Sequence, residues 1–407
     1  MTGFTFKDVL KNLLYNFLSS ALPTVILQFV VQPIIANKLG ADLNGQYLTL
    51  MSLNFFVIGI TASVLNTVRM LQNEEYIEKE IVGDFNIILL SFAILIIILF
   101  PIGYYYYVKN ASVIDLLLYI LIGILYLYHD YIFAQYRLKM QFNKILVNNI
   151  ILIIGYFLGI MIFLFVNSKW QYIFITSYIL SGIYDYLNTD FIKEPLKKTP
   201  LFRKTAEKTG ALMLANMLNS STAYFDKLIL YPLLGGVAVS IYSTASLVGK
   251  ILYLVSSPLN SLLLSYLVKV KTFRIEYLKN NKFVIICFVL IGYILCVIIG
   301  YPLTDLLYPK WADSSQIYIP ITVAANTFML VSNLINTILI RYYKMNYQII
   351  IQAINMILYL IVSLVMLHFW GLIGFSIGVA VVAAIKMIIL LVIIGKSSDI
   401  SKNDMLT

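Results

Sequence analysis

Long apolar segments recur along the whole chain, and they constrain its fold more than any other feature. A spanning helix needs about 20 mostly apolar residues, whereas barrel strands alternate over about ten. Twelve segments meet the helical requirement, at about 13–36, 45–68, 81–108, 113–136, 145–166, 171–191, 210–234, 237–267, 282–307, 315–340, 347–369 and 371–394. The sequence therefore predicts an all-α integral membrane protein with about 12 transmembrane helices.

Basic residues are distributed unevenly between the two sides of this predicted topology. Only 12% of the 407 residues are charged, against about 25% in a soluble domain. The segments predicted to lie inside hold 22 of the 29 Lys and Arg residues, and the outer loops hold 4. Because cytoplasmic loops carry the excess of Lys and Arg, both termini are predicted to be cytoplasmic. The net charge of +10 thus reflects topology, and no nucleic-acid partner is expected.

The chain is predicted to consist of two halves. A shift of 195 residues aligns Leu39-Gly40 with Leu234-Gly235 and Tyr47 with Tyr242, and it superposes six spans on six. This pattern indicates a parallel repeat, with a chance match between apolar helices as the alternative. Prolines and basic residues mark the segment between the halves as a cytoplasmic linker held at anionic lipid head groups. The predicted parts are an N-terminal lobe 1–191, a linker 192–209, a C-terminal lobe 210–395 and a cytoplasmic tail 396–407.

Charged residues within the predicted spans are the first candidates for function. Lys227, Lys250, Lys386 and Asp226 lie in them, and a charge at bilayer depth costs about 2.5–3.5 kcal/mol unless it faces a protein interior or a wet cavity. The three lysines are therefore candidates for binding an anion, although Lys227 and Lys386 could also extend to an interface. Asp226 is not expected to pair with the adjacent Lys227. It is interpreted as a partner of Lys250 or as an ion-coupling residue.

A second polar set lies toward the predicted inner ends of the first-half spans. Arg69 and Arg137 are candidates for the cytoplasmic entrance of an anionic head group, since arginine binds phosphate bidentately. Asp130 precedes Arg137 by seven residues and shares its helical face. Asp130 and Asp185 are candidates for ion coupling or charge pairing. Ordinary hydration near the interface is the alternative explanation for most of these residues.

The sequence lacks the motifs of nucleotide, metal and nucleophile chemistry. Gly395-Lys396-Ser397 resembles the end of a P-loop, but Leu390 occupies the position of the first glycine. The chain has only two histidines and two cysteines, so no metal, cofactor or enzymatic activity is expected. A membrane glycan polymerase or ligase is the alternative from another class, and it would need a large outer loop where this chain has short ones.

Two parts of the sequence resemble bacterial polysaccharide repeat-unit flippases, the O-antigen and capsule transporters of the polysaccharide transporter family. These parts are the run KLGADLNGQYLTL near the N-terminus and the combination of Asp226, Leu234-Gly235 and Tyr242. The resemblance implies a MATE-like fold of two six-helix lobes in the bacterial inner membrane. It also implies translocation of undecaprenyl-diphosphate-linked oligosaccharide to the outer leaflet by alternating access, with membrane lipids, a polysaccharide polymerase and glycosyltransferases as partners.

The same resemblance implies a cationic central cavity, to which Lys227, Lys250, Lys386, Arg69 and Arg137 are assigned. A MATE-type multidrug or cation antiporter is the alternative of the same fold, and it should present an acidic, aromatic-lined cavity. The lysines within the spans argue against it. A major-facilitator transporter is excluded because the loop after the second span reads RMLQNEEYIEKE, without that family's basic glycine-aspartate-arginine signature.

Overall fold

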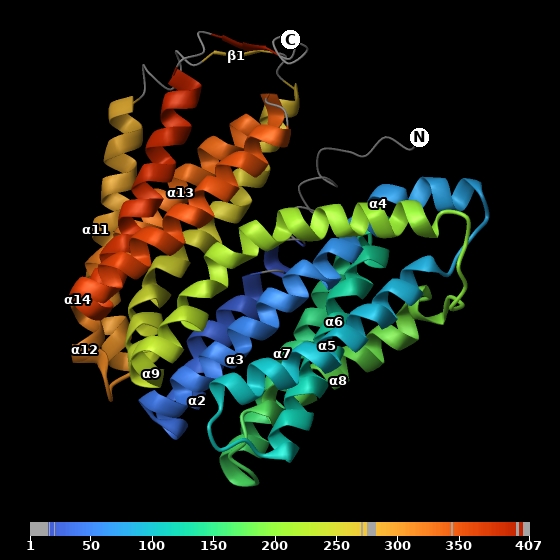
Figure 1. Cartoon of the computed structure of the whole chain (residues 1–407), viewed down its shortest axis with the longest axis horizontal. Helices are drawn as coiled ribbons and strands as arrows, with labels where there is room; N and C mark the ends of the chain where they lie inside the picture. Colours follow the sequence, from blue (N-terminus) through green and yellow to red (C-terminus); the bar gives the residue numbers. More distant parts are fainter. Residues whose placement is uncertain are drawn as a thin grey trace. The chain divides into compact units, whose positions relative to one another are not determined.

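The structure is a computed structural model that describes residues 15, 17–19, 21–269, 272–274, 282–342, 345–395 and 399–401. The described residues are nearly all helical, as predicted (Figure 1). In chain order the helices are η1 (Leu27–Val31), α2 (Gln32–Leu39), α3 (Ala41–Ile60), α4 (Ala62–Glu78), α5 (Asp84–Tyr107), α6 (Val113–Leu138), α7 (Phe142–Phe165), α8 (Gln171–Asn188), η2 (Phe191–Lys193), α9 (Phe202–Lys269), α11 (Lys282–Leu307), α12 (Ala312–Gln316), α13 (Ile319–Tyr342) and α14 (Met345–Gly395). The exceptions are two short antiparallel strands, β1 (Thr272–Arg274) and β2 (Asp399–Ser401). Most of the predicted tail 396–407 lies outside the described residues.

Nine helices within the described ranges are long and apolar enough to cross a membrane. Two of the long helices each contain two predicted spans. α9 is interrupted at Gly235, and α14 is interrupted at Trp370 and Gly371, where the backbone leaves helical geometry. α8, which covers the sixth predicted segment, is not among the nine. The number of twelve spans and the cytoplasmic location of the termini therefore stay predictions.

The helices form two compact units. Unit 1 comprises Met1–Leu39 and Leu43–Leu233, and unit 2 comprises Gly40–Asp42 and Leu234–Thr407. The first part of α9 belongs to unit 1 because its residues bond to earlier helices. Asn216 Nδ2 donates to the Gly59 carbonyl at 3.1 Å, and the Tyr107 hydroxyl donates to the Leu228 carbonyl at 3.2 Å. The units thus divide the chain at a different point from the predicted lobes, which stay a prediction.

Unit 1 is built around α6, which contacts α4, α5, α7 and α8. Its tyrosines Tyr119, Tyr131 and Tyr136 are fully buried. Tyr119 stacks on Phe100 with ring centroids 4.6 Å apart, and its hydroxyl donates to the Leu50 carbonyl at 2.7 Å. Because a buried phenol needs a partner for its polar end, this bond lets a large aromatic ring fill the centre of the unit.

Close packing of α7 on α8 depends on two glycines. Gly155 and Gly159 stand four residues apart on one face of α7, the small-xxx-small pattern that lets membrane helices approach closely. A Cβ on Gly155 would lie 2.3 Å from Ser177 Cα, and one on Gly159 would lie 2.4 Å from Ile173 Cα. Any side chain at either position would force the two helices apart.

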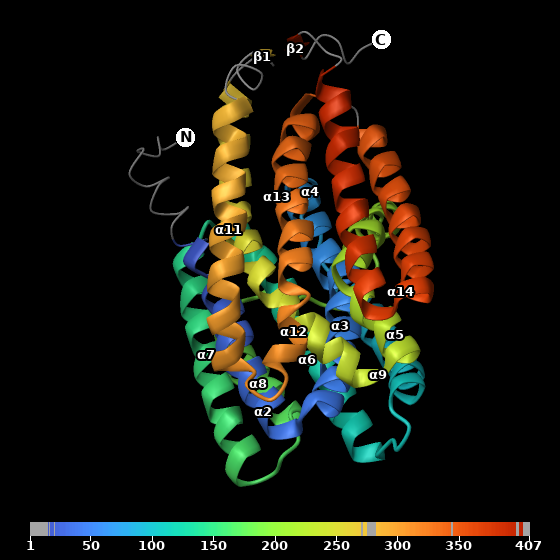
Figure 2. The ribbon, with the colours of Figure 1, turned by 90° about the vertical axis from the view of Figure 1, so that its left-hand side faces the viewer.

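In unit 2, α11, α13 and the two segments of α14 run side by side (Figure 2). The C-terminal part of α9 joins them through a small core of Ala245, Val248, Ile319 and Val323, all fully buried. A Cβ on Gly374 would lie 1.9 Å from the Met366 carbonyl oxygen. The turn between the two segments of α14 therefore requires a glycine there.

The two glycines that the 195-residue shift aligns share an unusual backbone. Gly40 has φ +82° and Gly235 has φ +81°, in the left-handed region that favours glycine. The segments that follow them meet within unit 2, where Ser240 Oγ donates to the Ala41 carbonyl at 2.6 Å. The matching φ angles are consistent with the predicted repeat at this position.

Candidate functional site

Lys227 and Asp226 form an ion pair, so the expectation that these neighbours would not pair is wrong. Lys227 Nζ lies 2.9 Å from Asp226 Oδ2 and 3.0 Å from Oδ1, and both side chains are largely buried. The reason is that the long lysine side chain bends back to the preceding carboxylate. Where little water is present, an unpaired buried charge costs more free energy than an ion pair with non-ideal helical geometry. Lys227 is therefore neutralised where it stands.

An aromatic patch of Phe55, Tyr126 and Tyr224 lies in the same unit, contributed by α3, α6 and α9. The ring of Phe55 is 5.8 Å from that of Tyr126 and 6.0 Å from that of Tyr224, and all three side chains are half-buried. Asp130 stands one turn beyond Tyr126 on the same face of α6, where its Oδ2 accepts a hydrogen bond from Ser63 at 2.8 Å. Aromatic faces beside a carboxylate form a surface suited to a cation.

Arg69 is held in a closed pair with Glu194 of the segment that follows η2. Its two terminal nitrogens bind the two carboxylate oxygens at 2.8 and 2.6 Å, and its guanidinium carbon lies 4.1 Å from the Phe191 ring centroid and 4.5 Å from that of Phe85. The Arg69 side chain is 5% exposed. The predicted role of Arg69 as an entrance for phosphate would require this pair to open. Arg137, the other predicted entrance residue, is exposed near the end of α6.

Asp185 lies at the centre of a buried polar cluster that also contains His129, Asn148, Ser181 and Tyr136. The cluster joins α6, α7 and α8. Asp185 is 0% exposed, and its Oδ1 accepts hydrogen bonds from the Tyr136 hydroxyl at 2.9 Å and from Asn148 Nδ2. Its Oδ2 lies 3.8 Å from His129 Nδ1. Asp185 is therefore an internal group and not an interfacial, hydrated one.

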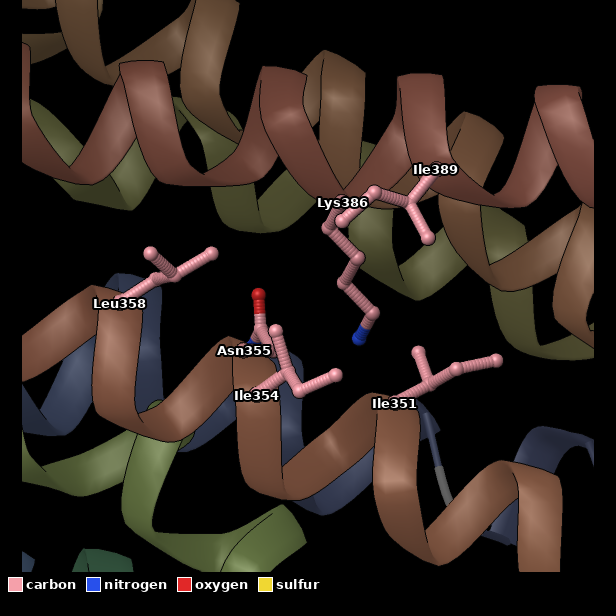
Figure 3. A pocket seen from close by; sticks show the side chains of 6 residues that line it. All are labelled: Ile351, Ile354, Asn355, Leu358, Lys386 and Ile389. Carbon is pink, nitrogen blue, oxygen red and sulfur yellow. The ribbon is translucent and has the colours of Figure 1, made fainter.

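Lys386 projects from the second segment of α14 toward the first (Figure 3). Its Nζ lies 3.3 Å from Gln352 Oε1, and it lines a cavity of about 20 Å³ together with Asn355 and aliphatic side chains of α14. Lys386 stands fifteen residues beyond the turn at Gly371, or about 22 Å along the helix. The structure thus pairs this lysine with a neutral amide.

Lys250 is half-buried in unit 2, on the C-terminal part of α9. The preceding residue, Gly249, lets α9 approach α13 closely, because a Cβ at this position would lie 2.2 Å from Asn326 Nδ2. Lys250 and Lys386 therefore belong to one compact unit, while Arg69, Arg137 and Lys227 belong to the other.

Several partners of the predicted residues escaped the sequence analysis. Glu194 and Gln352 neutralise or solvate predicted cations, and Asn148 and Ser181 surround Asp185. The signal available for the last two was polarity within apolar runs, such as the Asn148-Asn149 pair inside a predicted span. No cluster of three or more His, Cys, Asp or Glu residues that could hold a metal ion occurs in the part of the chain that the structure describes.

Comparisons with known proteins identify the fold. A scan against family models gives no match, and a search of curated proteins also gives none. Among solved structures, the chain is similar to an inward-facing multidrug resistance MATE transporter of the MOP superfamily, with 11% identity, a TM-score of 0.65, and coverage of 93% of this chain and 96% of that one. It is also similar to the lipid II flippase MurJ in an inward closed conformation, with 13% identity, a TM-score of 0.66, and coverage of 93% and 87%.

A third similar structure is a mutant of the Vibrio cholerae MATE transporter VcmN, with 15% identity, a TM-score of 0.59, and coverage of 95% of this chain and 96% of that one. At these identities the likeness concerns the fold. The MATE-like fold implied by the sequence resemblance is confirmed, and the chain is a multi-pass membrane protein of that architecture.

Proposed function

We propose that this protein is a flippase that moves an oligosaccharide, linked through diphosphate to undecaprenol, from the inner to the outer leaflet of a bacterial inner membrane. The observation that carries the proposal is Lys386, a half-buried lysine of unit 2 whose Nζ lies 3.3 Å from the neutral amide oxygen of Gln352. Coulombic attraction between a lysine and a phosphate strengthens as the effective dielectric falls. Such a lysine therefore favours a phosphate over a cationic ligand.

The fold supports the same proposal, because it is similar to that of the lipid II flippase MurJ. Alternating access follows if the lipid-linked oligosaccharide binds one arrangement of the helices more tightly than the other. Lys250 is the second proposed phosphate ligand, because it belongs to the same unit as Lys386. A polysaccharide polymerase and glycosyltransferases, which would consume and supply the substrate, are the proposed functional partners.

A MATE-type cation antiporter is the second candidate, and the aromatic patch favours it. Phe55, Tyr126 and Tyr224 stand near Asp130 in unit 1, as a site for an organic cation would require. The two candidates differ in which unit holds the substrate. A flippase depends on the lysines of unit 2, and an antiporter depends on Asp130 of unit 1.

Transport in liposomes distinguishes the two candidates. The purified protein is reconstituted with a fluorescent undecaprenyl-diphosphate oligosaccharide, and flipping is followed by the fraction that a membrane-impermeant reagent can quench. Lys386→Ala should lower the rate at least tenfold, and Lys386→Arg should restore part of it because the charge is kept. Lys139→Ala is the matched control, since Lys139 is half-exposed and its loss removes one positive charge from the surface.

Parallel liposomes measure export of a cationic dye, with native protein and with Asp130→Asn. If the dye is exported, if Asp130→Asn abolishes that export, and if no lipid-linked oligosaccharide moves, the protein is an antiporter and the flippase proposal is wrong. Flipping that is equally fast with Lys386→Ala and with native protein would show that Lys386 does not hold the phosphate.

A further inference from the structure

The polar cluster around Asp185 contains one oxygen with no hydrogen-bond partner. Asp185 Oδ2 is buried and unsatisfied among the described residues, although Oδ1 of the same carboxylate accepts two bonds. Buried polar atoms in proteins nearly always have a partner. The distance of 3.8 Å from Oδ2 to His129 Nδ1 is too long for a hydrogen bond. A buried carboxylate oxygen without a donor calls for a bound partner, and a proton is the smallest one that could satisfy it.

The hydrogen-bond donors of the cluster show where one proton must be. Asn148 donates through Nδ2 to Asp185, so its Oδ1 faces the other way and can only accept. Ser181 Oγ donates its single hydrogen to that oxygen at 2.6 Å. Ser181 Oγ must then accept from His129 Nδ1, which lies 2.7 Å away. His129 therefore carries a proton on Nδ1, and this proton points to Ser181 Oγ.

Charge balance shows that one more proton is exchangeable. With Nδ1 protonated, His129 is neutral until Nε2 also takes a proton. If neither Nε2 nor Asp185 holds that second proton, the cluster has a net charge of −1 around a carboxylate that is 0% exposed. An uncompensated buried charge is strongly unfavourable. The neutral cluster, with one additional proton on either residue, is thus favoured as long as water is excluded.

We propose that His129 and Asp185 together bind one exchangeable proton in unit 1, and that this proton is the coupling ion of transport. Release of the proton requires water or a rearrangement of α6, α7 and α8 to stabilise the remaining negative charge. Proton binding is thereby linked to the conformation of the unit. An alkali cation fits less well, because the protonated Nδ1 of His129 lies only 3.8 Å from the free oxygen.

Other titratable groups surround the pair. Tyr128 and Tyr136 of α6 and Tyr184 of α8 interact electrostatically with Asp185, and Asp130 of α6 does so with His129. On α7, the side-chain amide of Asn148 donates a hydrogen bond to Asp185. Tyrosines are neutral at physiological pH, and the carboxylate of Asp130 is turned to Ser63 of α4. Asp185 is therefore the anion that the test removes.

The chain has only two histidines, His129 and His368, so nitrogen NMR of histidine-labelled protein in lipid nanodiscs gives two sets of signals. His368→Gln assigns them. We expect the Nδ1-protonated form of His129 at high pH and a second protonation as the pH falls. Because a nearby opposite charge favours the charged form by about one pH unit or more, Asp185→Asn should move the midpoint of this titration at least one unit lower, a tenfold loss of proton affinity.

Two further variants make the result decisive. Tyr136→Phe removes a donor to the carboxylate while keeping the ring, so it should move the midpoint to higher pH; it also tests the pair if Asp185→Asn does not fold. Asp190→Asn is the control, because Asp190 is exposed and paired with Lys139. It should leave the midpoint unchanged. A midpoint that moves with neither Asp185→Asn nor Tyr136→Phe overturns the proposal.

Sodium is tested at constant pH, with choline to keep the ionic strength fixed. Sodium could shift the His129 signals in the native protein but not in Asp185→Asn. That result would assign the site to an alkali cation and overturn the proposal that the bound ion is a proton. Only the description of the proton as the coupling ion depends on the proposed function. If the titration behaves as expected and no oligosaccharide is flipped, the proton site stands while the proposed function fails.

Discussion

Removing the charge of Glu194 should destabilise unit 1 far more than removing the charge of an exposed glutamate. Glu194 is the counter-charge of Arg69, and their side chains are 13% and 5% exposed. The guanidinium also lies between two aromatic rings, those of Phe85 and Phe191. Glu194→Gln keeps the shape and one acceptor oxygen at this place, but it leaves the charge of Arg69 buried without a carboxylate.

The size of the effect follows from the geometry of the pair. At the 2.6 Å between Arg69 Nη2 and Glu194 Oε1, the gross Coulombic attraction is about 6 kcal/mol at an effective dielectric constant of about 20. Desolvation of both ions offsets most of this in the intact pair. Removing one partner loses the attraction while the desolvation of the other ion remains, which costs about 3–5 kcal/mol. We expect a loss of about 3 kcal/mol for Glu194→Gln, because its amide oxygen still accepts one hydrogen bond.

Thermal unfolding in detergent is followed by size-exclusion chromatography of the heated protein, and it ranks the variants by their thermal stability. The double variant Arg69→Met/Glu194→Gln should recover more than half of the loss, since it removes the buried charge and keeps apolar packing between the rings. The matched control is Arg203 with Glu207, an exposed pair whose side chains are 90% and 66% accessible. Glu207→Gln should change stability by less than about 1 kcal/mol.

The argument about the buried pair is refuted if Glu194→Gln is no more destabilising than Glu207→Gln. It is also refuted if the double variant is as unstable as the sum of its single variants, because independent effects add when no interaction couples the two residues.

Two other substitutions test the packing of each unit. Gly155→Ala should destabilise unit 1 by about 1–3 kcal/mol, because its Cβ would lie 2.3 Å from Ser177 Cα. The control Gly292→Ala should be nearly neutral, because nothing lies within 4 Å of its Cβ. Equal unfolding temperatures for the two variants would contradict the close approach of α7 to α8. Trp311→Phe should lower the stability of unit 2 by about 1–2 kcal/mol, because the buried indole Nε1 donates to Thr244 Oγ1 at 2.9 Å. The control Trp370→Phe should lower it less, because Trp370 is 63% exposed. A lower unfolding temperature for Trp370→Phe than for Trp311→Phe would contradict a stabilising role of the Trp311–Thr244 bond.

The helices could be predicted from the sequence because their signal is local. The run at residues 85–107 is uncharged and mostly apolar, and the polar groups of its backbone can be satisfied in a bilayer only in a helix or a closed barrel. Gly40 and Gly235 were also visible as matched positions of the internal repeat, although their left-handed backbone was not predicted.

The partners of the charged residues could not be predicted, because their signal is not local. Arg69 meets Glu194 across 125 positions of sequence, and Asn148 meets Asp185 across 37. Periodicity places a side chain on a face of its helix but does not say which helix lies opposite. The prediction for Asp226 and Lys227 was wrong for another reason. Helical spacing disfavours an ion pair between adjacent residues, but in a buried position the nearest counter-charge is the most favourable partner.

The pairing of the cations changes the argument about the substrate. From the sequence, five basic residues contribute alike to a positive cavity. In the structure, the two buried cations of unit 1, Arg69 and Lys227, each meet a carboxylate. The field of a close ion pair falls off faster with distance than that of a single charge, so these two residues attract a diphosphate only weakly.

In unit 2, Lys386 contacts the neutral amide of Gln352, while unit 1 also holds the carboxylates of Asp130 and Asp185. The proposed phosphate site therefore lies in unit 2, and the proposed proton site lies in unit 1. Coupled transport requires that binding of one of these ligands changes the affinity for the other.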